Sequence, residues 1–190
     1  MSESIPSAWL TRFARLIQRG GSVLDLAAGG GRHTRLLLDM GFRVTAVDRD
    51  VERLRPLAGE RCELRAIDLE AGAPWPLGRN YDGIVVINYL HRPLLAPLAA
   101  ALAPGGVVIY ETFAVGNERF GRPRNPEFLL RPGELLAAFA ALSVVAFEQG
   151  EVTQPRPAVI QRIAAVAGPH GELPECPAET TVGHSAAMRS

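Results

Sequence analysis

The feature that most restricts the fold of this 190-residue chain is an apolar run that passes through five small residues into a helix. Residues 22–26 form the run, residues 27–31 are alanine and glycine, and apolar side chains at helical spacing predict a helix over 32–40. Small residues let a ligand approach the backbone closely, and a helix N-terminus offers free N–H groups to an anionic group. This order of strand, loop and helix indicates a nucleotide or dinucleotide site.

Apolar runs and amphipathic stretches alternate along the chain, separated by glycines and prolines, which favours an α/β domain. The β-branched run at 84–87 is typical of a parallel strand buried on both faces. The last two strands, joined by a turn-rich segment, are expected to pair antiparallel at an edge of the sheet. The pattern predicts strands over 22–26, 42–47, 63–67, 84–88, 107–110, 142–147 and 159–166, and helices over 7–19, 32–40, 51–58, 94–102 and 132–139.

Length and composition predict one domain and exclude several classes of protein. A chain of 190 residues buries about two-thirds of its surface on folding, so one core over 1–167 is expected. The net charge is zero and all 20 basic residues are arginines spread along the chain, which gives no electrostatic indication of nucleic-acid binding. From residue 168 onward the composition shifts to Pro, Gly, Glu, Thr, Ser and Ala without periodicity, so 168–190 is expected to be a disordered tail.

Cysteine use and hydropathy point to a reducing compartment. Cys62 and Cys176 lie far apart with no CxxC spacing, so neither a disulfide framework nor a metal site is predicted. No stretch approaches the ~18 apolar residues of a membrane helix, and the N-terminus lacks the pattern of a signal peptide. We therefore expect a cytoplasmic protein that does not interact with membranes.

The loop at 27–31 allows two classes of ligand, and the residues around it favour one of them. A dinucleotide fingerprint would place a third glycine where Thr34 stands, and its first strand is normally apolar throughout, whereas Asp25 interrupts this one. A buried carboxylate needs a partner, and a ligand ammonium group is a good one, whereas a pyrophosphate would be repelled. The loop therefore suits a zwitterion better than a dinucleotide.

At this point the sequence closely resembles the class I S-adenosylmethionine-dependent methyltransferases of the small bacterial type. Their first motif runs Asp-x-Gly-x-Gly-x-Gly after an apolar strand, and Asp25 to Gly31 match it, with Ala27 in place of the first glycine. Further matches follow in the family's order, namely Val47-Asp48, Asp68-Leu69, the fourth-strand segment 81–88, and Leu102-Ala103-Pro104-Gly105-Gly106.

This resemblance implies a three-layer, doubly wound α/β fold with a mostly parallel seven-stranded sheet and an antiparallel last strand, the Rossmann-like methyltransferase fold. It also implies S-adenosylmethionine as cofactor, with S-adenosylhomocysteine as product. Asp48 would bind the ribose hydroxyls and Asp68 the adenine amino group, although each could instead be a helix-capping or turn residue. The expected cofactor-binding residues are Asp25, Ala27, Ala28, Gly29, Gly31, His33, Asp48, Arg49, Asp68, Leu69, Asn88 and Tyr89.

Methyl transfer from a sulfonium is an in-line displacement, so the protein mainly contributes positioning, and a general base is optional. In this fold the acceptor meets the methyl group beside the ends of strands four and five. His91 is the candidate base because its pKa normally lies near neutrality, although it could equally cap the following helix or line the cofactor pocket without proton transfer. Glu111 could orient the substrate or bond to loop N–H groups. The arginine-containing loop at 113–131 is either a substrate lid or a solvated loop.

The expected partner is a small-molecule methyl acceptor, because the fold uses residues 1–167 and leaves no insertion that could bind a macromolecule. Residues 88–91 are also not the Asn-Pro-Pro-aromatic motif of methylases that act on nucleic-acid bases. We expect a monomer or homodimer. The competing hypotheses are an NAD-dependent oxidoreductase and a non-catalytic S-adenosylmethionine-binding protein.

Overall fold

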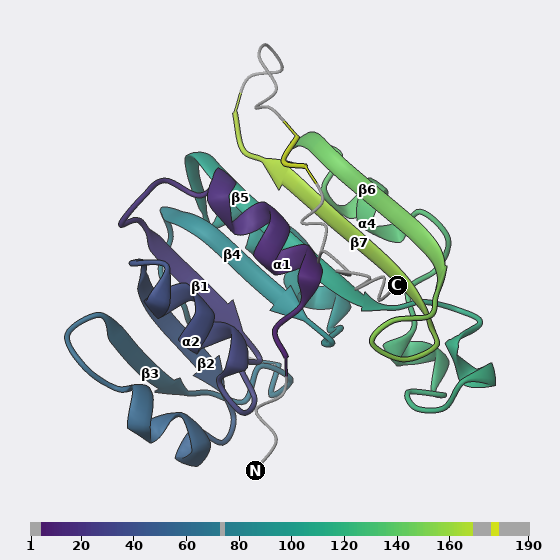
Figure 1. Cartoon of the computed structure of the whole chain (residues 1–190), viewed down its shortest axis with the longest axis horizontal. Helices are drawn as coiled ribbons and strands as arrows, with labels where there is room; N and C mark the ends of the chain where they lie inside the picture. Colours follow the sequence, from purple (N-terminus) through teal and green to yellow (C-terminus); the bar gives the residue numbers. More distant parts are fainter. Residues whose placement is uncertain (1–4, 73–74, 169–175, 179–190) are drawn as a thin grey trace, which may run out of the picture.

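The computed structural model describes residues 5–72, 75–168 and 176–178, and within them it contains a seven-stranded sheet in the order β3-β2-β1-β4-β5-β7-β6 (Figure 1). The predicted fold class is confirmed. The strands are β1 (Ser22–Leu26), β2 (Arg43–Asp48), β3 (Cys62–Ala66), β4 (Tyr81–Ile87), β5 (Leu102–Phe113), β6 (Ser143–Val152) and β7 (Ala158–Val166).

The first five strands are parallel to one another, and β7 runs antiparallel between β5 and β6. Parallel neighbours end at the same edge of a sheet, so the loops that follow β1, β2, β3, β4 and β5 gather at one edge. The predicted antiparallel pairing of the last two strands is confirmed, with Phe147 opposite Ile163.

Helices cover both faces of the sheet and give the three-layer arrangement. In Figure 1, α1 (Ala8–Phe13) and α2 (Arg32–Asp39) lie on the near face, whereas α4 (Glu134–Ala138) lies behind β6 and β7. On the near side, buried side chains such as Trp9 and Leu37 pack on the sheet. On the far side, α3 (Leu95–Ala100) and α4 contribute a second apolar cluster. Each face of the sheet therefore has its own core.

Two of the predicted helices differ from the structure. The segment expected as a helix over 51–58 is the 3₁₀ helix η2 (Glu52–Leu57), because Pro56 has no N–H for a helical hydrogen bond. The helix expected over 7–19 is shorter, since α1 ends at Phe13 and the 3₁₀ helix η1 (Ala14–Leu16) follows.

The predicted boundaries around β5 and its following loop also differ. β5 begins at Leu102 instead of the expected residue 107, and its pairing with β4 is irregular between the Tyr81 and Gly83 pairs. The 3₁₀ helix η3 (Arg92–Leu94) precedes α3. The loop at 113–131 contains the 3₁₀ helices η4 (Asn117–Arg119) and η5 (Pro126–Phe128), and a bridge between Ala114 and Leu130 closes it.

Most of the segment predicted as a disordered tail, 168–190, lies outside the described residues. Of its described residues, Pro177 is buried, and its carbonyl accepts a hydrogen bond of 2.7 Å from Arg12 Nε in α1. Within the described parts of the chain, no helix is both long and apolar enough to cross a membrane.

The backbone around Gly106 provides a test of the sheet packing. A Cβ added at Gly106 would lie 2.6 Å from the Tyr81 carbonyl oxygen, which is backbone and has little freedom to move. Gly106→Ala is expected to lower the free energy of unfolding by about 1–3 kcal/mol. The measurement is urea denaturation. The matched control is Gly59→Ala, where an added Cβ meets nothing within 4 Å, with an expected change below about 0.5 kcal/mol.

Candidate functional site

A hollow of about 430 Å³ opens at the carboxyl ends of the parallel strands. We call it the acidic hollow, because three carboxylates, Asp48, Asp68 and Glu70, line it against one cation, Arg49. The structure thus brings together the residues predicted after β2 and after β3. Of the expected cofactor-binding residues, those that line it are Ala27, Asp48, Arg49, Asp68, Leu69 and Tyr89.

The loop between β1 and α2 approaches Asp48 through its backbone. Gly29 N donates a hydrogen bond of 2.8 Å to Asp48 Oδ2, and Ala28 N donates to the Val47 carbonyl at 3.0 Å. Gly31 has a φ of 80°, and an added Cβ there would lie 2.7 Å from a Leu54 methyl carbon. At Gly29, by contrast, an added Cβ would meet nothing closer than 4.0 Å. The loop is therefore packed on one side and open on the other, as close approach of a ligand requires.

Asp25 lies under this loop and does not line the acidic hollow. Its side chain is 1% exposed and accepts a hydrogen bond of 2.6 Å from Thr34 Oγ1. Burial raises the pKa of Asp25 to about 7, against the lowering effect of the Thr34 hydrogen bonds. The partner of this buried carboxylate in the structure is thus Thr34, and its predicted role toward a ligand ammonium group stays a prediction.

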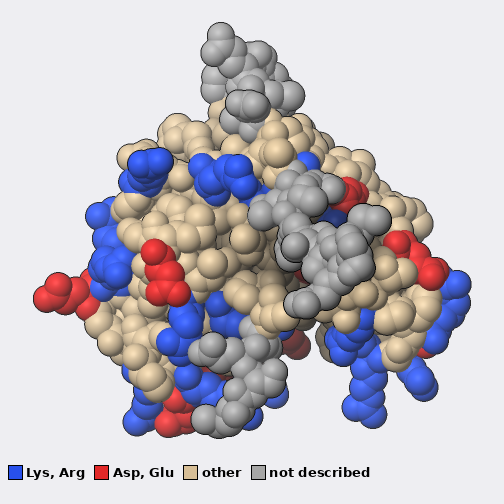
Figure 2. Space-filling view, in the orientation of Figure 1, with Lys and Arg blue, Asp and Glu red and all other residues tan. Residues whose placement is uncertain are grey.

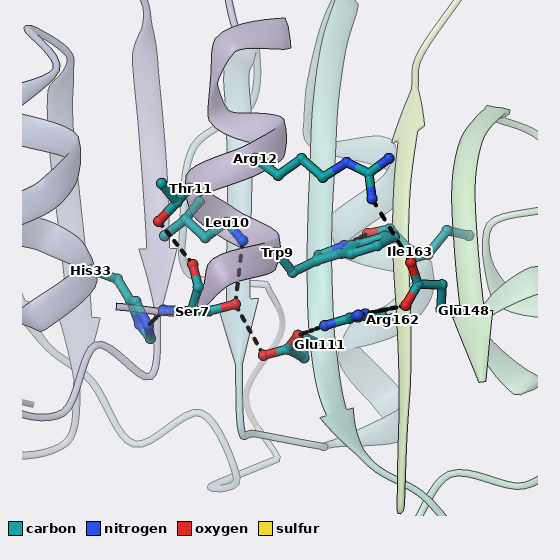
Figure 3. Close-up of polar contacts among 10 residues, drawn as sticks. All are labelled: Ser7, Trp9, Leu10, Thr11, Arg12, His33, Glu111, Glu148, Arg162 and Ile163. Carbon is teal, nitrogen blue, oxygen red and sulfur yellow. Dashed lines mark hydrogen bonds and ion pairs between the residues drawn. The ribbon is translucent and has the colours of Figure 1, made fainter. Parts of the chain in front are cut away.

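His33 is also buried, and it links α2 to the start of α1. Its Nε2 accepts a hydrogen bond from Ser7 N at 3.2 Å (Figure 3) and another from Arg32 Nε at 3.1 Å. Burial, assisted by the charge of Arg32, lowers the pKa of His33 to about 4, so the ring is neutral at physiological pH and can accept these bonds. The structure places His33 against Ser7, outside the acidic hollow, and its predicted contact with the cofactor stays a prediction.

Tyr89 follows β4 and lies between the acidic hollow and a smaller one of about 190 Å³. Its Oη is buried without a hydrogen-bond partner among the described residues. Burial and the neighbouring charges of Glu70 and Asp68 raise the pKa of Tyr89, so the hydroxyl keeps its proton. This hydroxyl lies beside the Glu70 carboxylate and adds a polar group to the wall that the two hollows share.

A larger cavity of about 480 Å³ lies on the other side of the β4 end. We call it the arginine cavity, because Arg32, Arg156 and Arg162 line it. Its walls come from residues 5–8, the ends of β4 and β5, and the β6–β7 hairpin. Asn88 lines both this cavity and the smaller hollow that Tyr89 shares with the acidic hollow. The three spaces therefore adjoin one another at residues 88–89.

The two predicted catalytic residues lie in different surroundings. Glu111 lines the arginine cavity, and its carboxylate accepts hydrogen bonds from Ser7 Oγ at 3.0 Å and from Arg162 Nη1 at 3.2 Å (Figure 3). His91 is half-buried at the start of η3 and lines none of the three spaces described above. Neither contact pattern tests proton transfer, so both roles stay predictions.

Comparison with known proteins identifies the family. Residues 2–122, well over half of the chain, match a family model described as a methyltransferase domain. The chain belongs to the methyltransferase domain family. The class predicted from the sequence, a class I S-adenosylmethionine-dependent methyltransferase, is therefore confirmed together with its cofactor.

Among solved structures, the chain is 27% identical to the 1,6-didemethyltoxoflavin-N1-methyltransferase of Burkholderia thailandensis, whose crystal structure contains 1,6-didemethyltoxoflavin and S-adenosylhomocysteine. The match has a TM-score of 0.63 and covers 85% of this chain and 77% of that one. TehB from Haemophilus influenzae shares the fold with a TM-score of 0.69 at 18% identity, over 85% of this chain and 62% of TehB.

A curated relative matches a shorter part of the methyltransferase. Ribosomal RNA small subunit methyltransferase H from Picosynechococcus sp. is 39% identical over 72 residues, which are 34% of this chain and 24% of that protein. The chain thus spans about a quarter of the length of this relative.

Several residues of these spaces were not predicted from the sequence. Ile67 and Glu70 flank the predicted Asp68 and could have been included from their place in the same loop. Phe128 reaches the acidic hollow from the distant loop at 113–131, which no local signal indicates. In that loop Arg119 pairs with Glu151 at 3.3 Å, and the remaining arginines are exposed, namely Arg122, Arg124 and Arg131.

The raised pKa of Asp25 predicts a pH dependence of stability. The folded protein keeps this proton up to about pH 7, whereas the unfolded chain releases it near the ordinary value of 3.8. The Asp25 contribution to stability therefore falls as pH rises through this window. As pH rises through this window, the free energy of unfolding of Asp25→Asn is expected to increase relative to that of the wild type, by up to about 1.4 kcal/mol per pH unit.

The measurement is urea denaturation of both proteins at about pH 5 and about pH 8. The lowered pKa of His33 has the opposite effect, because the folded protein keeps His33 neutral and loses stability as pH falls below 6.5. This effect is common to both proteins and cancels when their free energies of unfolding are compared. A difference that stays constant across the window would contradict the assignment of a raised pKa to Asp25.

Proposed function

We propose that the acidic hollow binds the adenosyl part of S-adenosylmethionine and that the arginine cavity binds a small-molecule methyl acceptor. The observation that carries this proposal is the convergence of Asp48 and Asp68, from two different strand ends, on one hollow beside the glycine loop. These are the positions at which the family resemblance implies contacts to the ribose and the adenine. Residues 1–167 would form the domain that performs the reaction.

The charge of the acidic hollow suits this cofactor. Its lining carries three carboxylates and one guanidinium, whereas the ligand carries a sulfonium and an ammonium group against one carboxylate. Opposite net charges favour binding. Asp48 accepts hydrogen bonds from Gly29 N at 2.8 Å and from Asp50 N at 3.2 Å, which orient it. A carboxylate has about four acceptor positions, so Asp48 can still accept from two hydroxyls.

Bound S-adenosylmethionine supplies a methyl group on a sulfonium, which the acceptor attacks directly. The chain's own contribution is to hold the two molecules on opposite sides of the β4 end. Asn88 stands there with a φ of 60°, and its N–H donates a hydrogen bond of 2.8 Å to the Glu111 carbonyl. This bond fixes residues 88–89 between the acidic hollow and the arginine cavity, and such orientation is a large source of rate enhancement in displacements.

A small molecule is the proposed acceptor because the cavity volume of about 480 Å³ lies in the range of small-molecule sites. The Burkholderia relative, which was crystallised with 1,6-didemethyltoxoflavin, supports this class. In the view of Figure 2, arginines and acidic side chains are interspersed over the coloured surface, which gives no support to a nucleic-acid acceptor on that face. A monomer or homodimer stays our prediction.

Asp48→Asn and Asp68→Asn test the cofactor site. Each is expected to weaken binding of S-adenosylmethionine and S-adenosylhomocysteine about tenfold, because a neutral amide forms weaker hydrogen bonds to the adenosine than a charged carboxylate does. The measurement is isothermal titration calorimetry, with NAD titrated in parallel and with no binding of NAD expected. The control is Asp39→Asn, an exposed carboxylate at the end of α2 that lines none of the three spaces.

Unchanged affinity in both site variants would refute the placement of the cofactor. Tight binding of NAD by the wild-type protein would refute the choice of ligand.

A further inference from the structure

We propose that the methyl acceptor carries an anionic group, such as a carboxylate, on a flat apolar body, and that Arg156 binds the anion. This inference rests on the proposed function, because it assigns chemistry to the cavity proposed for the acceptor. Three observations carry it, namely the charge balance of the cavity, the free guanidinium groups and an aromatic side chain beside one of them.

The charged side chains of the arginine cavity do not cancel. The lining contains three arginines, Arg32, Arg156 and Arg162, and one carboxylate, Glu111. Glu111 is already engaged with Arg162 at 3.2 Å and with Ser7 Oγ at 3.0 Å. After this pairing two guanidinium groups remain, so the cavity presents a net positive charge to its occupant.

The carboxylates nearest to this pairing are also engaged. Glu148 accepts a hydrogen bond from Arg162 Nε at 2.9 Å, and Arg12 lies 3.9 Å from its other oxygen (Figure 3). Glu151, next to the lining residue Val152, pairs with Arg119 at 3.3 Å. Neither glutamate forms an ion pair with Arg32 or Arg156, so among the described residues the positive charge in the cavity stays uncompensated.

Arg32 and Arg156 have no ion pair with any of the residues that the structure describes. The hydrogen bond of Arg32 goes to His33, which is neutral at physiological pH, and it uses Nε, which leaves both terminal nitrogens. Arg156 lies at the tip of the β6–β7 hairpin, and its guanidinium carbon is 5.9 Å from the centre of the Phe113 ring. Guanidinium groups pair with carboxylates through two parallel hydrogen bonds, so an anionic group of the acceptor could form an ion pair with either arginine.

Apart from the charged side chains and the polar Ser7, Asn88 and Gln154, the wall of the cavity is apolar and suits a ring of an acceptor. Phe113, Ile160 and Pro155 line it together with Val152. Because Arg156 lies near the Phe113 ring, a ring of the acceptor that packs on this wall brings its anionic substituent to the guanidinium. The acidic hollow has the opposite charge and would repel the same anion. Donor and acceptor are thus directed to different spaces by charge.

The test uses benzoate as the anionic probe and benzamide as its neutral counterpart of equal size. Binding to the full chain saturated with S-adenosylhomocysteine is followed by ligand-observed NMR, which detects the weak, millimolar affinity expected of so small a ligand. The wild type is expected to bind benzoate about tenfold more tightly than benzamide. Arg156→Ala is expected to reduce this preference severalfold, since only Arg32 then remains to attract the anion, and Arg156→Lys to retain more of it, because lysine keeps the charge but not the bidentate geometry.

The matched control is Arg53→Ala, which removes the same charge from an exposed position that lines none of the three spaces. It is expected to leave the preference for benzoate unchanged. Equal binding of the two probes by the wild type, absence of benzoate binding, or an unchanged preference in Arg156→Ala would overturn the inference.

Calorimetry with S-adenosylhomocysteine separates this inference from the proposed function. All variants at Arg156 are expected to bind it as the wild type does, because Arg156 does not line the acidic hollow. Equal binding of benzoate and benzamide by a wild-type protein that binds S-adenosylhomocysteine counts against the anionic acceptor alone. Failure of the wild type to bind S-adenosylhomocysteine counts against the cofactor site itself.

Discussion

Residues Ile84, Val85, Val86 and Ile87 of β4 are each at most 6% exposed, because one apolar cluster packs on each face of this strand. Their burial fixes the register of β4 with β1 on one side and with β5 on the other. That register sets where each strand ends, and therefore which side chains meet at the carboxyl edge. The site is a consequence of this packing, since residues 88–89 begin where the apolar run stops.

The parallel part of the fold and half of the site could be predicted because the signals are local. The strand, the small-residue loop and the helix at 22–40 follow one another in sequence, so their residues alone define the motif. Asp48 and Asp68 each follow a strand directly, and parallel strands bring such positions to the same edge. The helical pattern at 51–58 predicted an α-helix, whereas the structure has a 3₁₀ helix there, because Pro56 lacks a hydrogen-bond donor.

The other half of the site could not be predicted, because its residues meet through tertiary packing. Ser7 joins His33 and Glu111, three residues that come from α2, β5 and the segment before α1. No spacing rule relates positions so far apart in the chain. For the same reason Phe128 in the acidic hollow and Arg156 in the arginine cavity carry no signal in their own neighbourhoods. Asp25 was recognised in the sequence as a charged residue in an apolar strand, but its hydrogen bond to Thr34 could not be predicted from it.

The β6–β7 hairpin has a consequence for how acceptor specificity evolves in the proposed arrangement. The hairpin forms one wall of the arginine cavity but none of the acidic hollow, and the family match ends at residue 122, before the hairpin begins. The hairpin thus contributes to the proposed acceptor cavity alone, whereas the rest of that cavity is lined by residues from earlier in the chain. In the proposed arrangement, substitutions at the hairpin tip can therefore change the acceptor while the residues that line the acidic hollow stay the same.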